Sequence, residues 1–163
     1  DEIRGMDGDD LMKGGAGDDR ARGFAGADTV DGGNGDDEVR GGGGDDVVRG
    51  GRGADRVFGD GGDDRMSGGL GDDRLNGGGG DDVMRGGGGQ DVFLFARSTA
   101  ADRIVDFRIG EDKIMFRDAS GVERFRDLEI IDDGGDAVIA FDRGTIRLDG
   151  VDADDLSASD FLF

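Results

Sequence analysis

Apolar and polar residues recur with a strict period of nine between Gly5 and Leu94, which gives ten nonapeptides without an insertion. Positions 1 and 4 are always Gly, position 6 is always Asp, and position 8 is always apolar. The position-8 residues are Met12, Ala21, Val30, Val39, Val48, Val57, Met66, Leu75, Met84 and Phe93. One apolar residue between two mostly polar ones predicts a three-residue strand with a single inward face.

The glycine-rich first part of each nonapeptide predicts a turn, because Gly tolerates positive φ angles and close backbone approach. One short strand cannot bury its apolar residue alone, whereas stacked copies share a thin inner core. Each turn reverses the chain, so two nonapeptides form one coil of 18 residues with a sheet on each side. Strands 18 residues apart then become parallel neighbours about 4.8 Å apart. The period therefore predicts an all-β parallel β-roll.

Stacking aligns the position-6 carboxylates in two columns, one along each edge of the roll. The columns contain Asp10, Asp28, Asp46, Asp64 and Asp82, and Asp19, Asp37, Asp55, Asp73 and Asp91. Like charges at this spacing repel each other unless they are protonated or bridged by a cation. Carboxylates and turn carbonyls are hard oxygen ligands, and Ca²⁺ binds about six to eight of them in irregular geometry, whereas Mg²⁺ requires a stricter octahedron. The pattern therefore predicts calcium sites between stacked turns.

Composition narrows the function classes further. The chain contains 37 Gly, no Pro, no Cys and no His, and its formal net charge is −20. The absence of His and Cys excludes zinc, haem–His and cysteine-nucleophile centres, and a Ser–His–Asp triad, within this chain. The negative charge argues against nucleic acid and anionic membranes as partners, and no apolar run is long enough to predict membrane insertion. A flexible acidic linker has a similar composition, but three invariant positions over ten copies favour a folded repeat.

Arginines recur at positions 7 and 9, which face outward in the predicted strands. They include Arg20, Arg40, Arg49, Arg56, Arg65, Arg74 and Arg85. We interpret them as a solvated face that offsets the nearby Asp residues. An anion-binding or polysaccharide-binding face is the alternative.

The nonapeptide G-G-x-G-x-D-x-U-x resembles the calcium-binding repeat of the RTX (hemolysin-type) family, and the resemblance spans residues 5–94. It implies a right-handed parallel β-roll in which calcium lies between turns 18 residues apart, with at most eight sites. The implied ligands are the ten position-6 Asp residues and backbone carbonyls of the turns. We assign the carbonyl ligands to the position-4 residues Gly8, Gly17, Gly26, Gly35, Gly44, Gly53, Gly62, Gly71, Gly80 and Gly89. Ala27, Ala54 and Gln90 depart from the usual Asp of position 5, and we expect weaker sites there.

Residues 95–163 form a second region, richer in β-branched and aromatic residues, that we expect to be an antiparallel β cap over the last coil. Its strand-like runs are Val92–Ala96, Arg103–Phe107, Lys113–Phe116, Leu128–Ile131, Ala137–Phe141 and Thr145–Leu148. Turns are expected at 134–135 and 143–144, and short helical turns at 121–127 or 154–160. The expected buried cap residues are Phe93, Phe95, Ile104, Phe107, Ile114 and Phe116.

The segment D-x-I-x-D-F-x-x-G-x-D-K-I, from Asp102 to Ile114, resembles the region after the repeats in serralysin-type metalloproteases and related type I secretion substrates. This resemblance implies secretion to the extracellular space or cell surface, folding on calcium outside the cell, and the type I secretion machinery as a partner. It also implies an uncleaved signal at the end of the chain, here Asp160–Phe163. The alternative for these residues is a last strand that completes the cap.

We therefore expect a calcium-binding module that forms the C-terminal part of a larger secreted protein. The chain contains no H-E-x-x-H motif and no other catalytic constellation. Two alternatives remain: the substrate-binding module of a secreted metalloprotease, lipase or polysaccharide epimerase or lyase, and an adhesion module.

Overall fold

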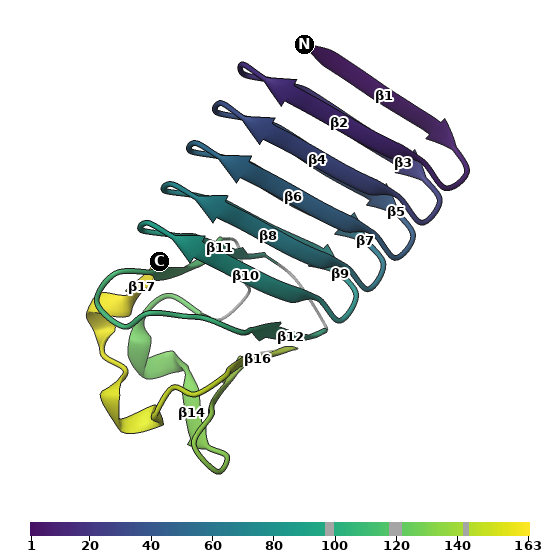
Figure 1. Ribbon diagram of the computed structural model, residues 1–163. Helices are drawn as coiled ribbons and strands as arrows, with labels where there is room; N and C mark the ends of the chain where they lie inside the picture. The colour runs from purple at the N-terminus through teal and green to yellow at the C-terminus, as the bar shows by residue number, and fades with distance from the viewer. Residues whose placement is uncertain (97–99, 118–121, 142–143) are drawn as a thin grey trace.

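The chain forms a stack of coils in which strands 18 residues apart lie side by side (Figure 1). The computed structural model describes residues 1–96, 100–117, 122–141 and 144–163. An eight-stranded sheet has the order β1-β3-β5-β7-β9-β11-β13-β17, and a nine-stranded sheet has the order β14-β15-β16-β12-β10-β8-β6-β4-β2. Pairing within the repeats is parallel throughout, as between Val48 and Met66. The predicted parallel roll is confirmed.

The strands of the repeats are six residues long rather than the three predicted. They are β1 (Glu2–Asp7), β2 (Leu11–Ala16), β3 (Arg20–Ala25), β4 (Thr29–Asn34), β5 (Glu38–Gly43), β6 (Val47–Arg52), β7 (Arg56–Gly61), β8 (Arg65–Leu70), β9 (Arg74–Gly79) and β10 (Val83–Gly88). Each strand joins positions 7–9 of one nonapeptide to positions 1–3 of the next. The glycine-rich part stays in the ladder, since Gly51 pairs with Gly69 although both have positive φ angles, 125° and 123°. The turn proper is reduced to positions 4–6.

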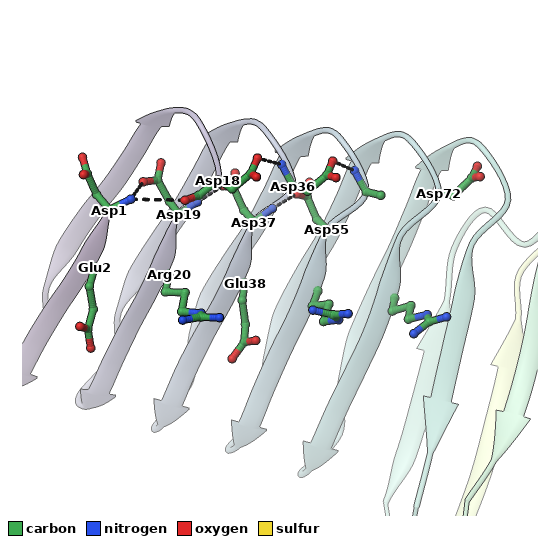
Figure 2. Close-up of a pocket in the computed structure, with 13 residues that line it drawn as sticks. Asp1, Glu2, Asp18, Asp19, Arg20, Asp36, Asp37, Glu38, Asp55 and Asp72 are labelled. Atoms are coloured by element: carbon green, nitrogen blue, oxygen red, sulfur yellow. Dashed lines mark hydrogen bonds and ion pairs between the residues drawn. The ribbon is translucent and has the colours of Figure 1, made fainter.

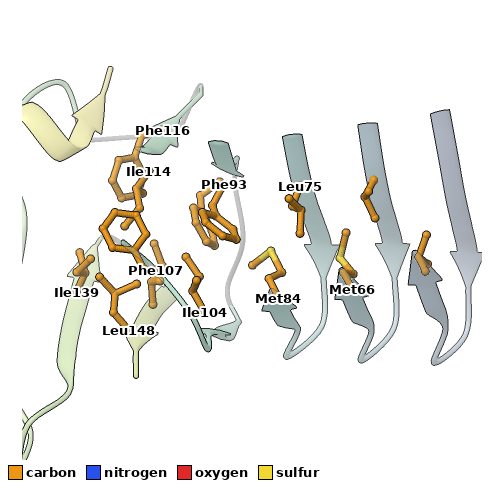
Figure 3. Packing of buried hydrophobic residues seen from close by; sticks show 14 of the residues in the cluster. Met66, Leu75, Met84, Phe93, Ile104, Phe107, Ile114, Phe116, Ile139 and Leu148 are labelled. Carbon is orange, nitrogen blue, oxygen red and sulfur yellow. The ribbon is translucent and has the colours of Figure 1, made fainter. Parts of the chain in front are cut away.

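The core of the roll is a single row of position-8 side chains on each sheet, as Figure 3 shows for Met66, Leu75, Met84 and Phe93. All ten position-8 residues are buried, with exposed fractions of at most 5%. The residues on either side of them along each strand are half-buried or exposed. The prediction that position 8 forms the core is therefore confirmed, and this core contributes only one buried side chain per nonapeptide.

Parallel stacking continues past the repeats into the C-terminal region. The eight-stranded sheet adds β11 (Val92–Phe95), β13 (Lys113–Phe116) and β17 (Phe161–Leu162), and the other sheet adds β12 (Ala101–Ile104) and β16 (Gly144–Leu148). Ile104 pairs with Met84, and Ile114 pairs with Phe93. These isoleucines keep the inward register although the spacing is no longer 18, because the extra residues lie in the loops. The boundary predicted between residues 94 and 95 falls inside β11.

Among the described residues, antiparallel pairing is confined to β14 (Glu129–Asp132), β15 (Ala137–Phe141) and β16. The C-terminal sheet is therefore mixed, with the expected antiparallel hairpins added beside the parallel rows. All six predicted cap residues are buried. The 3₁₀ helices η1 (Phe125–Asp127) and η3 (Ala158–Asp160) lie within the segments where helical turns were expected, and η2 (Ala153–Asp155) begins one residue before the second segment. The helical turn expected at 121–127 includes Gly121, and the turn expected at 143–144 includes Arg143; both residues lie outside the described residues. No helix in the described ranges has the length and hydropathy needed to span a bilayer.

Candidate calcium-binding columns

The position-6 carboxylates form two columns at the points where the repeat strands begin. We call Asp10, Asp28, Asp46, Asp64 and Asp82 the first column, and Asp19, Asp37, Asp55, Asp73 and Asp91 the second column. Nine of the ten residues are buried, with exposed fractions of at most 2%, and Asp10 at the open end is half-buried. Figure 2 shows Asp19, Asp37 and Asp55 of the second column, aligned along one edge of the stack.

Each column is tied together by its own backbone. The Asp28 N–H donates to Oδ1 of Asp46 at 2.7 Å, and the Asp46 N–H donates to Oδ1 of Asp64 at 2.8 Å. The same bond recurs along the second column, for instance from the Asp37 N–H to Asp55 Oδ1 at 2.8 Å. The structure therefore brings together residues 18 apart, in the pairs named as candidate ligands.

The second carboxylate oxygen of every column residue is left over. In the described part of the chain, Oδ2 of all ten position-6 Asp residues is buried without a hydrogen-bond partner. Burying an ionised oxygen without compensation is costly, so each Oδ2 requires a proton or a cation. Within the same described ranges, no three acidic side chains converge closely enough to hold a metal by themselves. A bound cation would therefore need backbone carbonyls as well, which suits Ca²⁺.

Burial raises the pKa of the column carboxylates from Asp37 onward along the chain. Burial raises the pKa of Asp64 and of Asp73 to about 7, and the charges of neighbouring column residues add to the effect. Burial likewise raises the pKa of Asp55, Asp82 and Asp91 to about 6. In each case the backbone hydrogen bond to Oδ1 opposes the rise. Asp64 and Asp73 are therefore partly protonated near neutral pH when no metal is bound.

Two invariant glycines shape the space around each carboxylate. At position 1, a Cβ on Gly32 would lie 2.5 Å from Asp37 Oδ2 and 2.6 Å from the carbonyl oxygen of Gly50, so only Gly fits. At position 4 all ten glycines have positive φ angles. A Cβ on Gly44 would collide with the carbonyl oxygen of Gly26, one coil earlier. The position-4 carbonyls thus face the next coil, where they can contribute to a shared ligand set.

Position 5 carries a second row of carboxylates outside each column. Beside the second column, this row borders a groove of about 770 Å³ (Figure 2). Their hydrogen bonds run in the opposite direction: Asp36 Oδ1 accepts the N–H of Ala54, one coil later, at 2.8 Å. Ala27, Ala54 and Gln90 keep this contact as donors. Ala27 and Ala54 have no carboxylate with which to accept the corresponding bond from the following coil, and weaker calcium sites at these turns stay a prediction.

The structure adds two residues that the repeat period did not identify. The Asp82 N–H donates to Oδ1 of Asp102, and the Asp91 N–H donates to Oδ1 of Asp112, both at 3.1 Å. Asp102 and Asp112 are buried and extend the first and second columns by one coil. The period missed them because they follow the preceding column residues by 20 and 21 positions rather than 18. Asp-x-Ile, the order of positions 6 to 8, was the available signal.

Comparisons with known proteins agree with this architecture. The RTX calcium-binding nonapeptide repeat matches four times, at residues 4–39, 22–57, 32–66 and 58–93. The extracellular lipase LipA from Serratia marcescens is similar in structure, with a TM-score of 0.62, 20% identity, and coverage of 100% of this chain and 40% of the lipase. The AlgE6R2 subunit of the mannuronan C5-epimerase from Azotobacter vinelandii has a TM-score of 0.55 and 27% identity, covering 76% of this chain and 91% of the subunit.

No curated protein matches the chain. The present chain spans less than half the length of the lipase, and the likeness to that structure concerns the fold. The repeat matches together cover residues 4–93, more than half of the chain. RTX repeats bind calcium in general. The chain belongs to the family of RTX calcium-binding nonapeptide repeat proteins.

Proposed function

We propose that this chain is a non-catalytic module whose repeats fold as Ca²⁺ binds between successive residues of the two columns. One observation carries the proposal: ten buried Oδ2 atoms without partners, aligned in two rows. A divalent cation between two such residues neutralises both carboxylates, and position-4 carbonyls are candidates to complete its oxygen shell. Each column of five residues has four successive pairs, so the two columns together would hold about eight ions.

The charge balance supports this number of ions. The segment 5–94 contains 21 acidic and 10 basic residues, a net charge of −11. Eight Ca²⁺ would contribute +16, which more than offsets the repulsion within the segment. Because binding occurs only in the folded stack, its free energy becomes folding free energy.

The calcium concentration at half-folding should be roughly tenfold or more higher at pH 6 than at pH 8, because protons compete with Ca²⁺ for carboxylates whose pKa is raised to about 6 or 7. The raised pKa also stabilises the metal-free fold below the ordinary Asp pKa, and this contribution is lost as the pH rises through about 6 to 7. Calcium titrations followed by circular dichroism at both pH values test this. A midpoint independent of pH would show that the column carboxylates are not the ligands.

We further propose that the module folds after export from the cell. Calcium sites of extracellular modules have dissociation constants of about 10⁻⁴–10⁻³ M, so such a roll would stay unfolded in the cytosol and fold outside. The extracellular lipase that shares the fold supports an extracellular location. A chain exported unfolded by the type I machinery needs a signal that works without structure, and we place it at the end of the chain.

Deletion of residues 162–163 should abolish export while leaving calcium-induced folding intact. Leu162 and Phe163 are 38% and 49% exposed, so the cap keeps its buried Phe161 and loses mainly the stacking of Phe163 on Phe116. Asp160, in contrast, is buried and accepts the N–H groups of Gly110 at 3.0 Å and of Ser157 at 2.9 Å. The matched variant Asp160→Ala should therefore destabilise the cap by about 1–3 kcal/mol, since it leaves these donors unpaired. Export is measured in a bacterium carrying a type I system. Normal export of the truncated chain would place the signal elsewhere.

A second candidate function is the binding of an anionic polysaccharide, as the binding module of a larger secreted enzyme or as an adhesion module. Arg56, Arg74 and Arg117 border a groove of about 540 Å³ on the outer side of the eight-stranded sheet, together with Phe58 and Asn76. Guanidinium groups pair with carboxylates, and an aromatic ring can contact a sugar face.

Retention of the calcium-loaded chain on immobilised polymannuronate tests this second function. The double variant Arg56→Ala/Arg74→Ala should weaken retention at least several-fold, and the loss should depend on salt, because two guanidinium groups that pair with carboxylates leave the groove. Arg49→Ala, on β6 of the other sheet, is the control. Equal retention of the double variant and the control would argue against the groove.

A further inference from the structure

Asp91, the last repeat residue of the second column, has a cationic neighbour that the other column residues lack at the same atom. Within the described part of the chain, its Oδ2 is the only column Oδ2 with a basic side chain within 4 Å, the Nη2 of Arg108 at 3.7 Å. The same Nη2 donates hydrogen bonds to the carbonyl oxygens of Gly87 and Gly89, the latter at 3.3 Å. The guanidinium thus contacts three oxygens of one turn, from positions 2, 4 and 6 of the tenth nonapeptide.

The turn one coil earlier in this column has the same three oxygens without a cation. Gly69, Gly71 and Asp73 occupy the equivalent positions, and Asp73 Oδ2 is buried and unpartnered. Asp82, the last repeat residue of the first column, also keeps an unpartnered Oδ2. At the open end of the same column, the N-terminal ammonium group of Asp1 pairs with Asp19, but through Oδ1 at 2.6 Å. Within the described residues, Arg108 is therefore the one basic side chain that reaches a column Oδ2.

Arg108 is held in this position by the column itself. Its backbone N–H donates to Asp112 Oδ2 at 2.8 Å, and Asp112 Oδ1 accepts the N–H of Asp91. Glu111 pairs with the Arg108 Nη1 at 3.2 Å on the outer side. From the other side of the turn, Asp106 accepts the N–H of Gly86 at 2.9 Å. Because backbone and side-chain contacts both fix it, Arg108 is part of a built site rather than a free surface residue.

We propose that the Arg108 guanidinium takes, between Asp91 and Asp112, the place that calcium takes between the earlier pairs of the second column. The comparison with the earlier pairs of column residues rests on the proposed calcium function, but the role of Arg108 at this turn does not. A covalently attached cation cannot be removed by a chelator. The C-terminal end of the roll, β11 and β13 with their turn, is therefore ordered without calcium and offers a formed sheet edge on which the repeats stack.

Hydrogen exchange measured by mass spectrometry in calcium-free chelator tests the proposal. In the wild-type chain, β11 and β13 should be protected while β5 and β6 exchange like an unfolded chain. Arg108→Met should accelerate exchange in β11 and β13 roughly ten- to hundredfold, since a charged buried partner is left unpaired. Added Ca²⁺ should restore this protection and bind with one additional ion. The control Arg103→Met removes the same charge from the same region and breaks a pair with Asp149 at 2.7 Å, without touching the turn.

Two results would overturn the proposal: exchange in β11 and β13 as fast as in β5 in the wild-type chain without calcium, or equal effects of Arg108→Met and Arg103→Met. If Arg108→Met prevents folding altogether, Arg108→Lys should retain part of the protection, and Arg108→Met/Asp91→Asn should regain part of it; failure of both also overturns the proposal. Absence of any calcium effect on β5 and β6 would refute the calcium function instead, and the chelator comparison would still decide the role of Arg108.

Discussion

In excess chelator at pH 8, the repeats that precede the turn held by Arg108 are expected to be disordered, and millimolar Ca²⁺ is expected to produce their full strand signal in circular dichroism. Each nonapeptide buries one apolar side chain, as Val48 and Val57 illustrate. One such side chain cannot offset the conformational entropy of nine ordered residues, several of them Gly. The columns add buried carboxylates that repel one another when ionised. Removal of calcium should therefore cost these repeats their entire stability.

The control for this prediction separates specific binding from screening of charge. Sodium chloride at matched ionic strength should restore little structure, because screening leaves the buried Oδ2 atoms without partners. Mg²⁺ should be weaker than Ca²⁺, since it binds carbonyl-rich irregular sites reluctantly. A roll with the same strand content in chelator and in calcium would refute the coupling of folding to metal binding.

The second large effect is expected from Asp46→Ala, compared with Asp10→Ala. Asp46 lies in the middle of the first column, accepts the N–H of Asp28 and donates its own N–H to Asp64. It therefore belongs to two successive pairs of column residues, and so to two proposed calcium sites. Asp10, at the open end of the stack, belongs to one. Asp46→Ala should raise the calcium midpoint by roughly tenfold or more and lower the Hill coefficient, because it opens adjacent sites and interrupts coupling between coils. Asp10→Ala should shift the midpoint less.

Calcium titration of both variants, followed by circular dichroism, measures the difference. Both substitutions remove one carboxylate and create no new charge, so the pair is matched in net charge. Equal midpoints and equal cooperativity would show that the two residues serve equivalent independent sites, contrary to the pairing of residues 18 apart.

The repeats were predictable because each invariant position obeys one physical constraint. Position 8 must be apolar to fill the shared core, and a Cβ on Gly32 would strike the carboxylate of Asp37. The strand length was underestimated because Gly is a weak strand former, yet Gly51 and Gly69 keep their ladder register. Tertiary stacking overrides that local preference.

The C-terminal region was less predictable because no period fixes its register. The burial of Ile104 and Ile114 followed from their apolar character, but their parallel alignment with Met84 and Phe93 depends on loops of irregular length. Because of the same irregular spacing, the period did not identify Asp102 and Asp112 as continuations of the columns. The position of Arg108 at the last turn could not be inferred, since it depends on a loop that returns to Gly87 and Gly89.

The most direct test of the two columns is the anomalous scattering of calcium in crystals of the metal-loaded chain. Peaks are expected along both edges of the roll, one between each pair of successive column residues, such as Asp46 and Asp64. No peak is expected between Asp91 and Asp112, where Arg108 lies. Peaks confined to the outward faces of the sheets, or columns without any peak in a folded roll at millimolar calcium, would contradict the account.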